Sequence, residues 1–205
     1  MLLPPSCPAC GALGRAPCAT CAAALRRAPS LPAPPGVDRC HAVLAYEGVG
    51  RELVARLKYR NARSAVPYLS AGMAALAQGR TLDVVTWVPT TAARRRSRGF
   101  DQAQLLAAAV ARRLRLRCRP LLRRAAGPAQ TGRTLAERRR GPAFRPHPRA
   151  RVPARVLLVD DVVTSGATLA AAARALRAAG AVEVHAVVAA RTPARRAPTA
   201  GVHSE

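Results

Sequence analysis

The sequence predicts an α/β domain, in which a largely parallel sheet is covered by helices, with a small cysteine-rich module in front of it. Apolar runs typical of buried strands alternate with helical stretches along most of the chain, which is the pattern of βαβ units. One such run, Val156–Val159, leads directly into a polar segment that contains a glycine and opens a helix. The module is indicated by four cysteines in the first 21 residues.

Length and composition are those of a globular protein. The chain has 205 residues, which is enough for one domain with a hydrophobic core and a small appendage. Half of the residues are hydrophobic but only 3% are aromatic, so Ala, Leu and Val must fill the core. The first residues lack the pattern of a signal peptide, and no stretch approaches the ~20 apolar residues of a membrane span. We therefore expect a cytoplasmic protein.

The charge of the chain is strongly positive. Lys and Arg number 34 against 10 Asp and Glu, for a net charge of +24, and such an excess attracts nucleic acid or other polyanions. The alternative is compositional bias, since a chain this rich in Ala, Arg, Pro and Gly can use Arg as its default surface residue. Lys58 is the only lysine, which favours a role for its point charge on a phosphate; the alternative is an ordinary helix-surface position.

A proline-rich stretch, residues 28–36, separates the module from the domain. Prolines at this density cannot continue a helix or a central strand, and they form a semi-rigid spacer. We therefore divide the chain into a module with its linker (1–36), a main domain (37–191) and a C-terminal tail (192–205).

The first half of the main domain is expected to contain two strands and two helices. A strand over 41–46 is followed by a helix over 50–59, which has its apolar residues on one face. A second helix is predicted over 66–78. The apolar run 83–89 is short and stopped by a proline, which is typical of a buried strand.

The second half begins with a helix over 100–114, in which Asp101 and Gln104 have capping-box spacing. A glycine after residue 179 is a typical helix end. In order, we expect a strand over 116–122, a basic stretch without periodicity over 123–151, a strand over 155–159, a helix over 167–179 and a strand over 182–190.

The segment 156–168, VLLVDDVVTSGAT, predicts a site for a phosphorylated ribose. After the strand, small residues let the backbone close around a phosphate, glycine can take a positive φ, and the N–H groups of the first helical turn face the anion. The hydroxyls of this segment add further donors. The candidate 5-phosphate residues are Thr164, Ser165, Gly166, Ala167 and Thr168.

Asp160 and Asp161 stand at the carboxyl end of the same strand, where ligands dock on open α/β sheets. Two carboxylates beside a phosphate site make chemical sense if they accept hydrogen bonds from the 2- and 3-hydroxyls of a ribose and share a Mg²⁺ carried by a pyrophosphate. The alternative is a strand–turn–helix with two solvated acids and an ordinary helix cap.

This string resembles the signature with which type I phosphoribosyltransferases bind phosphoribosyl pyrophosphate (PRPP), and it implies their fold. The string Trp87-Val-Pro89 with Arg98-Gly-Phe-Asp-Gln102 is similar to the corresponding signature of the ComF/GntX (competence protein F-like) family. Shorter similarities lie at Leu57-Lys-Tyr59, around Gln130–Arg138 and at Phe144, and together with the cysteines the resemblance spans residues 7–191.

The resemblance implies a pyrophosphate site at Arg98 and Gly99, for which Lys58 is a further candidate. The crowded arginines before Gly99 and the helix start after it also suit an anion, and the alternative is a solvated basic loop. Residues 123–144 stand where these enzymes carry a mobile hood that excludes water; the alternative is disorder. Salvage enzymes for 6-oxopurines place an aspartate where this chain has Thr164, so that such acceptors are disfavoured and the acceptor stays open.

The four N-terminal cysteines, Cys7, Cys10, Cys18 and Cys21, have the spacing C-x2-C-x7-C-x2-C, which suits a tetrahedral structural Zn²⁺. Disulfides are the alternative and are disfavoured in the cytoplasm. Cys40 and Cys118 are isolated and are expected to be packing residues.

Three functions remain open at this point. The first is Mg²⁺-dependent phosphoribosyl transfer from PRPP to an unidentified acceptor, with no catalytic base assigned. The second, implied by the ComF resemblance, is a non-catalytic accessory factor in natural transformation that binds single-stranded DNA or a DNA-uptake helicase. The third is a PRPP-sensing regulator on the same fold. The sequence leaves the oligomeric state undecided.

Overall fold

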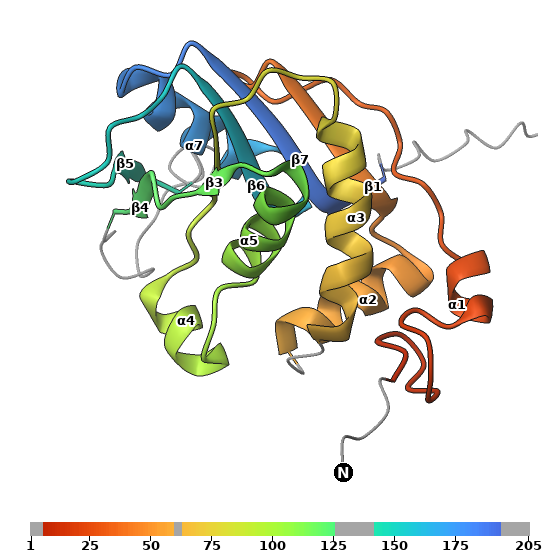
Figure 1. Cartoon of the computed structure of the whole chain (residues 1–205). Coiled ribbons are helices and arrows are strands. Elements are labelled where there is room, and N and C mark those ends of the chain that lie inside the picture. Colours follow the sequence, from red (N-terminus) through yellow and green to blue (C-terminus); the bar gives the residue numbers. More distant parts are fainter. Residues whose placement is uncertain (1–5, 60–62, 126–141, 194–205) are drawn as a thin grey trace, which may run out of the picture.

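Five strands form a parallel sheet at the centre of the molecule (Figure 1). The computed structural model describes residues 6–59, 63–125 and 142–193. The strand order is β1-β7-β6-β2-β3, and every neighbouring pair is parallel. The strands are β1 (Arg39–Ala45), β2 (Val84–Trp87), β3 (Arg117–Cys118), β6 (Arg155–Val163) and β7 (Glu183–Arg191).

Helices cover both faces of this sheet (Figure 1), as the α/β prediction requires. One hydrophobic cluster joins the strands to α2 (Gly48–Tyr59), α3 (Val66–Ala77) and α5 (Gln102–Leu114). A second cluster joins the opposite face to α7 (Ala167–Ala178). Alanine fills much of both clusters, which fits a chain that is poor in aromatic residues.

The connections place a crevice between β2 and β6. The chain leaves β2 through α5 and returns at β3, towards one edge of the sheet, whereas it leaves β6 through α7 and returns at β7, towards the other edge. Neighbouring parallel strands whose connections diverge in this way leave an opening beyond their carboxyl ends, and ligands of open α/β sheets bind there.

Several predicted elements differ from those found. The crowded arginines before Gly99, over which no helix was predicted, form helix α4 (Ala92–Arg98), with Thr91 as its N-cap and Gly99 as its left-handed C-cap. The strand expected over 116–122 is broken after β3 near a proline. Within the aperiodic basic stretch, β4 (Leu122–Arg124) and β5 (Phe144–Pro146) pair antiparallel.

The cysteine module and the proline-rich stretch pack closely on the domain. The module contains a short helix, α1 (Ala19–Ala23), and its buried Cys7 and Cys21 belong to the same hydrophobic cluster as Leu53 of α2. Next to the module, the chain runs antiparallel to the outer edge of β1, where the N–H of Ala45 donates to the carbonyl of Arg26 at 2.9 Å.

The proline-rich stretch then crosses towards α7. Arg191 donates from Nη1 to the carbonyl of Leu31 at 3.2 Å, and Arg177 donates from Nε to the carbonyl of Gly36 at 2.9 Å. The stretch expected to be a spacer is therefore held to the domain by hydrogen bonds. The division of the chain at residue 36 stays a prediction.

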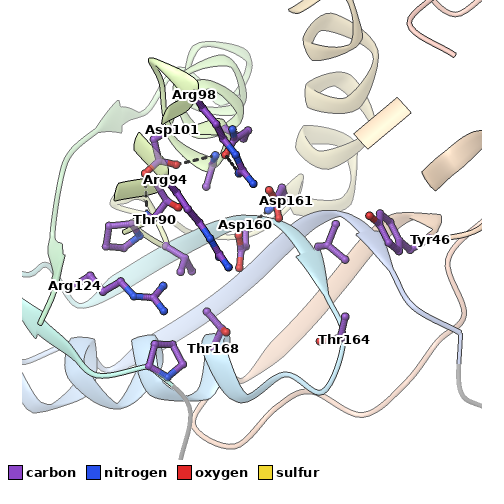
Figure 2. Close-up of a pocket in the computed structure, with 16 residues that line it drawn as sticks. Tyr46, Thr90, Arg94, Arg98, Asp101, Arg124, Asp160, Asp161, Thr164 and Thr168 are labelled. Carbon is purple, nitrogen blue, oxygen red and sulfur yellow. Dashed lines mark hydrogen bonds between the residues drawn. The ribbon is translucent and has the colours of Figure 1, made fainter. Parts of the chain in front are cut away.

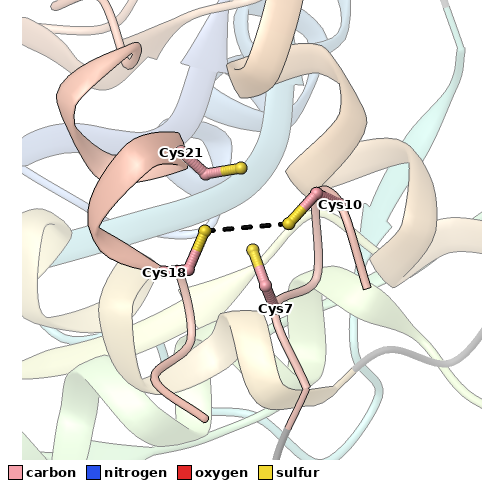
Figure 3. Close-up of side chains that lie close together, drawn as sticks. All are labelled: Cys7, Cys10, Cys18 and Cys21. Carbon is pink, nitrogen blue, oxygen red and sulfur yellow. Dashed lines mark hydrogen bonds between the residues drawn. The ribbon is translucent and has the colours of Figure 1, made fainter. Parts of the chain in front are cut away.

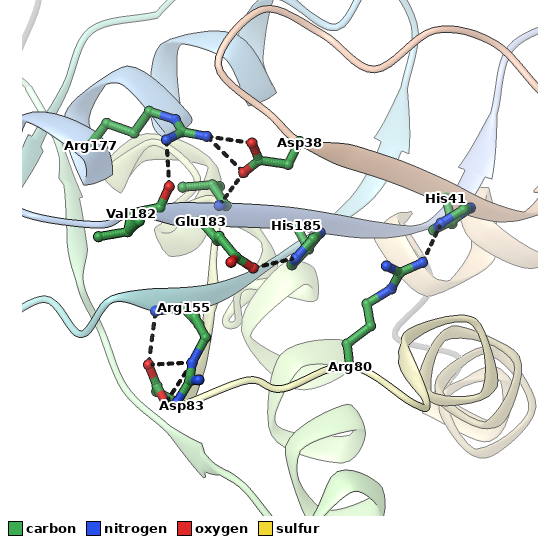
Figure 4. A network of polar contacts seen from close by, with 10 residues as sticks. Asp38, His41, Arg80, Asp83, Arg155, Arg177, Val182, Glu183 and His185 are labelled. Atoms are coloured by element: carbon green, nitrogen blue, oxygen red, sulfur yellow. Dashed lines mark hydrogen bonds and ion pairs between the residues drawn. The ribbon is translucent and has the colours of Figure 1, made fainter.

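Two ion pairs lie near the amino ends of the strands of the sheet (Figure 4). Arg155 of β6 donates to Asp83, with 2.6 Å between Nη2 and Oδ1, and the backbone N–H of Arg155 adds a bond of 2.8 Å to Oδ2. Arg177 of α7 forms a second pair with Asp38, at 2.7 Å. Among the described residues, no helix combines the length and the apolar character needed to cross a membrane.

Candidate functional site

A cavity of about 390 Å³ opens beyond the carboxyl ends of β2 and β6, at the crevice that the topology predicts (Figure 2). Its walls come from segments far apart in the sequence. They include Tyr46 after β1, Thr90 after β2, Arg94 and Arg98 of α4, Asp101 and Gln102 at the start of α5, Arg124 of β4, Asp160 and Asp161 of β6, and Thr164 and Thr168 around the start of α7.

Asp160 and Asp161 reach this cavity because β6 is longer than β2. The last pair between the two strands is Trp87 with Val159, and β6 continues for four more residues along β7. The two acids are the first residues of this overhang, where the neighbouring strand no longer covers them, and both are half-buried. The N–H of Asp161 donates to Oδ1 of Asp160 at 2.8 Å, which orients that carboxylate.

The predicted phosphate segment forms the turn between β6 and α7. Gly166 is the N-cap of α7 and has a φ of +77°, a left-handed conformation that favours glycine. Because glycine has no side chain with which to cap the helix, the first N–H groups of α7 are left to other partners, which is the usual basis of an anion site. Ser165 accepts from the N–H of Ala167 at 3.4 Å.

All five predicted phosphate residues line a hollow of about 30 Å³ in this turn, together with Asp160. Thr164 and Thr168 also line the large cavity, so the turn and the twin acids share one site. The structure therefore brings Asp160, Asp161 and the Thr164–Thr168 segment together.

The predicted pyrophosphate residues separate into three cases. Arg98 lines the cavity (Figure 2). Gly99 is the C-cap of α4, with a φ of +76°, and it turns the chain towards α5 without lining the cavity. Lys58 falls in the last turn of α2, but its side chain lies outside the described part of the structure.

Further residues that had not been assigned as ligands from the sequence also line the cavity, among them Arg94, Arg124, Tyr46 and Gln102. Arg94 stands four residues before Arg98 and therefore on the same face of α4, a spacing that could have pointed to it had the helix been expected. Arg124 lies over the ring of Phe144, with 5.6 Å from Cζ to the ring centroid. No sequence pattern indicates Tyr46, whereas Gln102 closes the Arg98–Gln102 string.

Asp101 anchors the segment between β2 and α5. It is 6% exposed and accepts from the N–H groups of Ala103 at 3.1 Å and Gln104 at 3.4 Å, which confirms the predicted cap. Its other oxygen accepts from the N–H of Thr90 at 3.0 Å. Burial raises the pKa of this carboxyl, and the nearby charge of Asp161 adds to the rise, against the lowering by these hydrogen bonds.

The electrostatics of the cavity suit a phosphorylated sugar that carries a metal ion. The side chains of Arg94 and Arg98 point towards Asp160 and Asp161 (Figure 2), and all four residues line the cavity. Carboxylates prefer hydroxyl donors and hard cations, whereas guanidinium groups bind phosphate oxygens in pairs. A single ligand with hydroxyls, phosphates and a bound cation can satisfy both walls.

The N-terminal cysteines form a separate cluster (Figure 3). The Sγ atoms of Cys7, Cys10, Cys18 and Cys21 all lie within 4.8 Å of one another, and those of Cys10 and Cys18 are 3.7 Å apart. A tetrahedral zinc site with Zn–S bonds of 2.3 Å has sulfur atoms about 3.8 Å apart, so the cluster fits Zn²⁺ closely. A disulfide needs about 2.05 Å between its sulfur atoms, and all six cysteines are free thiols.

The thiols of this cluster differ in acidity. Burial opposes ionisation of Cys7, but hydrogen bonds from the backbone of Cys18, Cys10 and Ala9 outweigh it and lower its pKa to about 6. Burial raises the pKa of Cys21 to about 12, and the neighbouring thiols add to the rise. Since a thiol must lose its proton to bind zinc, zinc binding at this cluster would release protons.

The second half of the chain matches the model of a known domain family. Residues 104–202 match the family model of the phosphoribosyl transferase domain, and this range contains most of α5, the twin acids, the Thr164–Thr168 turn, α7 and β7. With the parallel sheet and its covering helices, the match confirms the predicted fold class, an α/β domain of the type I phosphoribosyltransferase kind. The chain matches no curated protein.

The chain is also similar to solved enzyme structures. These include an allosteric regulatory enzyme of purine biosynthesis (25% identity, TM-score 0.43) and glutamine PRPP amidotransferase from B. subtilis (26% identity, TM-score 0.46). In both cases 62% of this chain is covered, and the chain spans only 26% of the length of the enzyme. Adenine phosphoribosyltransferase from Thermoanaerobacter pseudethanolicus is 17% identical with a TM-score of 0.43, over 69% of this chain and 86% of that enzyme. Similarity at this level assigns no activity to this chain.

Proposed function

We propose that this protein binds Mg·PRPP in the cavity between β2 and β6 and transfers the phosphoribosyl group to an acceptor, as a ComF-like member of the phosphoribosyltransferase superfamily. The observation that carries the proposal is the meeting of three elements in one cavity: the twin acids, the turn that opens α7, and the arginines of α4. The ComF-like assignment rests on the Arg98–Gln102 string, whose residues form the junction between α4 and α5.

Each part of the substrate has a matching part of the site. The 5-phosphate would bind the N–H groups and hydroxyls of Thr164–Thr168, while Asp160 and Asp161 would accept from the ribose hydroxyls. Arg98, with its neighbour Arg94, would bind the pyrophosphate. These acids also fit Mg²⁺ as oxygen ligands, and the ion would neutralise charge on the pyrophosphate.

The chemistry is a group transfer at C1 of the ribose. The bond between C1 and the pyrophosphate oxygen breaks, the pyrophosphate keeps the electron pair, and the acceptor supplies the electron pair of the new bond to C1. Positive charge that develops on the ribose ring is stabilised by the nearby carboxylates, and the arginines stabilise the charge on the leaving group. Arg124 borders the same cavity and adds positive charge to this wall.

A second candidate function is favoured by one observation. Helix α4 has no buried residue and carries Arg94, Arg95, Arg96 and Arg98, so that a basic ridge adjoins the cavity. Such a ridge suits a polyanion, and an accessory factor that binds single-stranded DNA would use it. Binding of this kind should weaken steeply as salt is raised, and binding that is absent or insensitive to salt would exclude this function.

Calorimetric titration with Mg·PRPP tests the first proposal. We expect saturable binding to the wild type and a rise in melting temperature, because a ligand at a hundred times its Kd stabilises the folded state by about 2.7 kcal/mol. The double variant Asp160→Asn/Asp161→Asn should lose both effects. The matched control is Glu52→Gln, which removes an exposed carboxylate from α2 and should bind as the wild type does.

A titration of well-folded wild-type protein with Mg·PRPP that shows no heat of binding would contradict the proposal. If Mg·PRPP binds, pyrophosphate release across a panel of acceptors separates an enzyme from a sensor, because a sensor binds PRPP without releasing pyrophosphate.

Zinc is proposed as the structural ion of the cysteine cluster, and elemental analysis of the purified protein should find about one zinc per chain.

A further inference from the structure

The segment that presents Arg98 to the cavity is an exposed excursion of the chain between β2 and α5. Since α4 has no buried residue, hydrophobic packing does not hold it in place. Asp101 ties the base of the excursion together, because its carboxylate accepts from Thr90 on one side and from Ala103 on the other. These contacts fix the two ends of the segment but do not reach the guanidinium of Arg98.

The side chain of Gln102 contacts the guanidinium of Arg98. Nη1 of Arg98 donates to Oε1 of Gln102 at a distance of 3.1 Å. Gln102 is the first residue of α5, is 2% exposed and lines the cavity, so this contact runs from a rigid helix start to the cation. The backbone of the helix start is itself pinned by the cap at Asp101.

The chemistry of the two side chains fixes the orientation of the amide. A guanidinium can only donate hydrogen bonds, so the amide oxygen must face Arg98 and the NH₂ group must point away from it. Among the described residues, Nε2 of Gln102 is buried without a hydrogen-bond partner. A buried donor without a partner destabilises the fold, and an apolar side chain of equal length would avoid that cost. Packing therefore does not explain a glutamine at this position, whereas the contact with Arg98 does.

A neutral amide is also the suitable partner for a cation that must bind an anion. A carboxylate at the same place would orient Arg98 equally well but would cancel its charge. The amide oxygen orients the guanidinium without neutralising its charge. The acids of β6 line the same cavity and attract the same guanidinium, whereas the uncharged contact with Gln102 holds it near the start of α5.

We propose that Gln102 is a positioning residue, whose amide oxygen holds the guanidinium of Arg98 where it binds the pyrophosphate of the substrate. This inference rests on the proposed function, since it assigns the anion that Arg98 meets. Gln102 acts through Arg98, and its own replacement should matter only while Arg98 is present.

A double-mutant cycle tests this dependence, with magnesium and inorganic pyrophosphate as the probe. Gln102→Met should weaken pyrophosphate binding about tenfold, as expected for one charge-assisted contact that loses its geometry. Arg98→Met should weaken it at least as much, and the double variant should bind no more weakly than Arg98→Met alone. The matched control is Gln104→Met, which makes the same change in the same helical turn at a residue that does not line the cavity.

Hydrogen exchange of α4 in the ligand-free protein gives a second, independent readout. Amides of residues 94–99 should exchange faster in Gln102→Met than in the wild type or in Gln104→Met, because the hydrogen bond from Arg98 of α4 to Gln102 of α5 is lost. Gln102→Leu should repeat the result if the Met variant folds poorly.

The outcomes separate the two proposals. Additive losses in the cycle, or wild-type affinity in Gln102→Met, would overturn the positioning role while leaving PRPP binding intact. A wild type that binds neither pyrophosphate nor PRPP would overturn the proposed function, and the role of Gln102 in ordering Arg98 would then be decided by exchange alone. Unchanged exchange in α4 would overturn that role as well.

Discussion

Gly166 meets two separate demands at the start of α7. Its φ of +77° lies in the left-handed region, where a β-carbon is strained. A β-carbon at this position would also lie 2.6 Å from Cγ of Pro34, which belongs to the proline-rich stretch. The positive φ was predictable from the sequence of the turn. The close approach of Pro34 was not, because Pro34 is 132 residues away along the chain.

Gly166→Ala should therefore destabilise the protein by about 2 kcal/mol and weaken Mg·PRPP binding, since either the turn or Pro34 must move. The measurements are urea denaturation and calorimetric titration. Gly79→Ala is the matched control, because Gly79 has a φ of +72° but nothing within 4 Å of the added β-carbon. If both variants lose equal stability, the contact with Pro34 contributes nothing.

Among the secondary-structure elements, those formed by local patterns were predictable and those formed by distant pairing were not. Helix α5 was predictable from the N-cap at Asp101, and β2 was predictable from an apolar run that ends at a proline. The last four residues of β6 are held in the strand by pairing with β7, which continues to Arg191. Because the sequence turns polar after Val159, the strand was predicted to end there. The pairing of β4 with β5 depends on residues about 20 positions apart in a basic stretch without periodicity.

Helix α4 was missed for a different physical reason. Sequence periodicity detects helices through the face they bury, and α4 buries none. Its end signals were nevertheless present, since Thr91 accepts from the N–H of Arg94 at 3.2 Å and Gly99 closes the helix. The lining of the cavity by Asp160, Asp161 and the Thr164–Thr168 turn was predictable from sequence because one strand–turn–helix carries them, whereas Arg94, Arg124 and Tyr46 are brought in by tertiary structure.

The ion pair between β2 and β6 should give the protein a distinct pH dependence. Hydrogen bonds from the side chain of Arg155, and then from its backbone N–H, lower the pKa of Asp83. A lowered pKa in the folded state means that the pair stabilises the fold above about pH 4, the ordinary range of an aspartate, and that this contribution is lost as the pH falls through the folded value. Asp83→Asn should thus melt at a lower temperature than the wild type at pH 7.

Thermal melts across the acid range check this expectation. The difference between Asp83→Asn and the wild type should shrink steadily below pH 4, because the wild-type carboxyl is then protonated too. Glu52→Gln, which disrupts an exposed pair within α2 at 3.8 Å, should show little difference at any pH. A gap in melting temperature that persists unchanged into strong acid would contradict the electrostatic explanation.

At the scale of the whole molecule, the cysteine cluster is built into the main core rather than attached to it. Cys7 and Cys21 are buried in the cluster that contains Leu53 and Leu57 of α2. Removal of the proposed zinc ion should therefore lower the melting temperature of the entire domain and speed hydrogen exchange in α2. A transition confined to the first 36 residues, with the domain unaffected, would show that the module is independent.

Zinc affinity should also fall as the pH is lowered. The buried thiol of Cys21 has a pKa raised to about 12, so that metal binding must displace its proton, and protons compete more strongly in acid. Competition with a chromophoric chelator between pH 8 and pH 6 measures this trend. An affinity independent of pH would argue against thiolate ligands.

The strand-like segment around Arg27 has a practical consequence for anyone who shortens this protein. It covers the outer side of β1, where Ala28 and Ala45 bond to the neighbouring backbone. In a fragment that starts at Val37, the second half of β1 would lose these partners, and its backbone N–H and C=O groups would be exposed at the edge of the sheet. Other copies of the fragment could pair with this exposed edge. Light scattering should show such a fragment self-associating, even though every residue of the ligand cavity is still present.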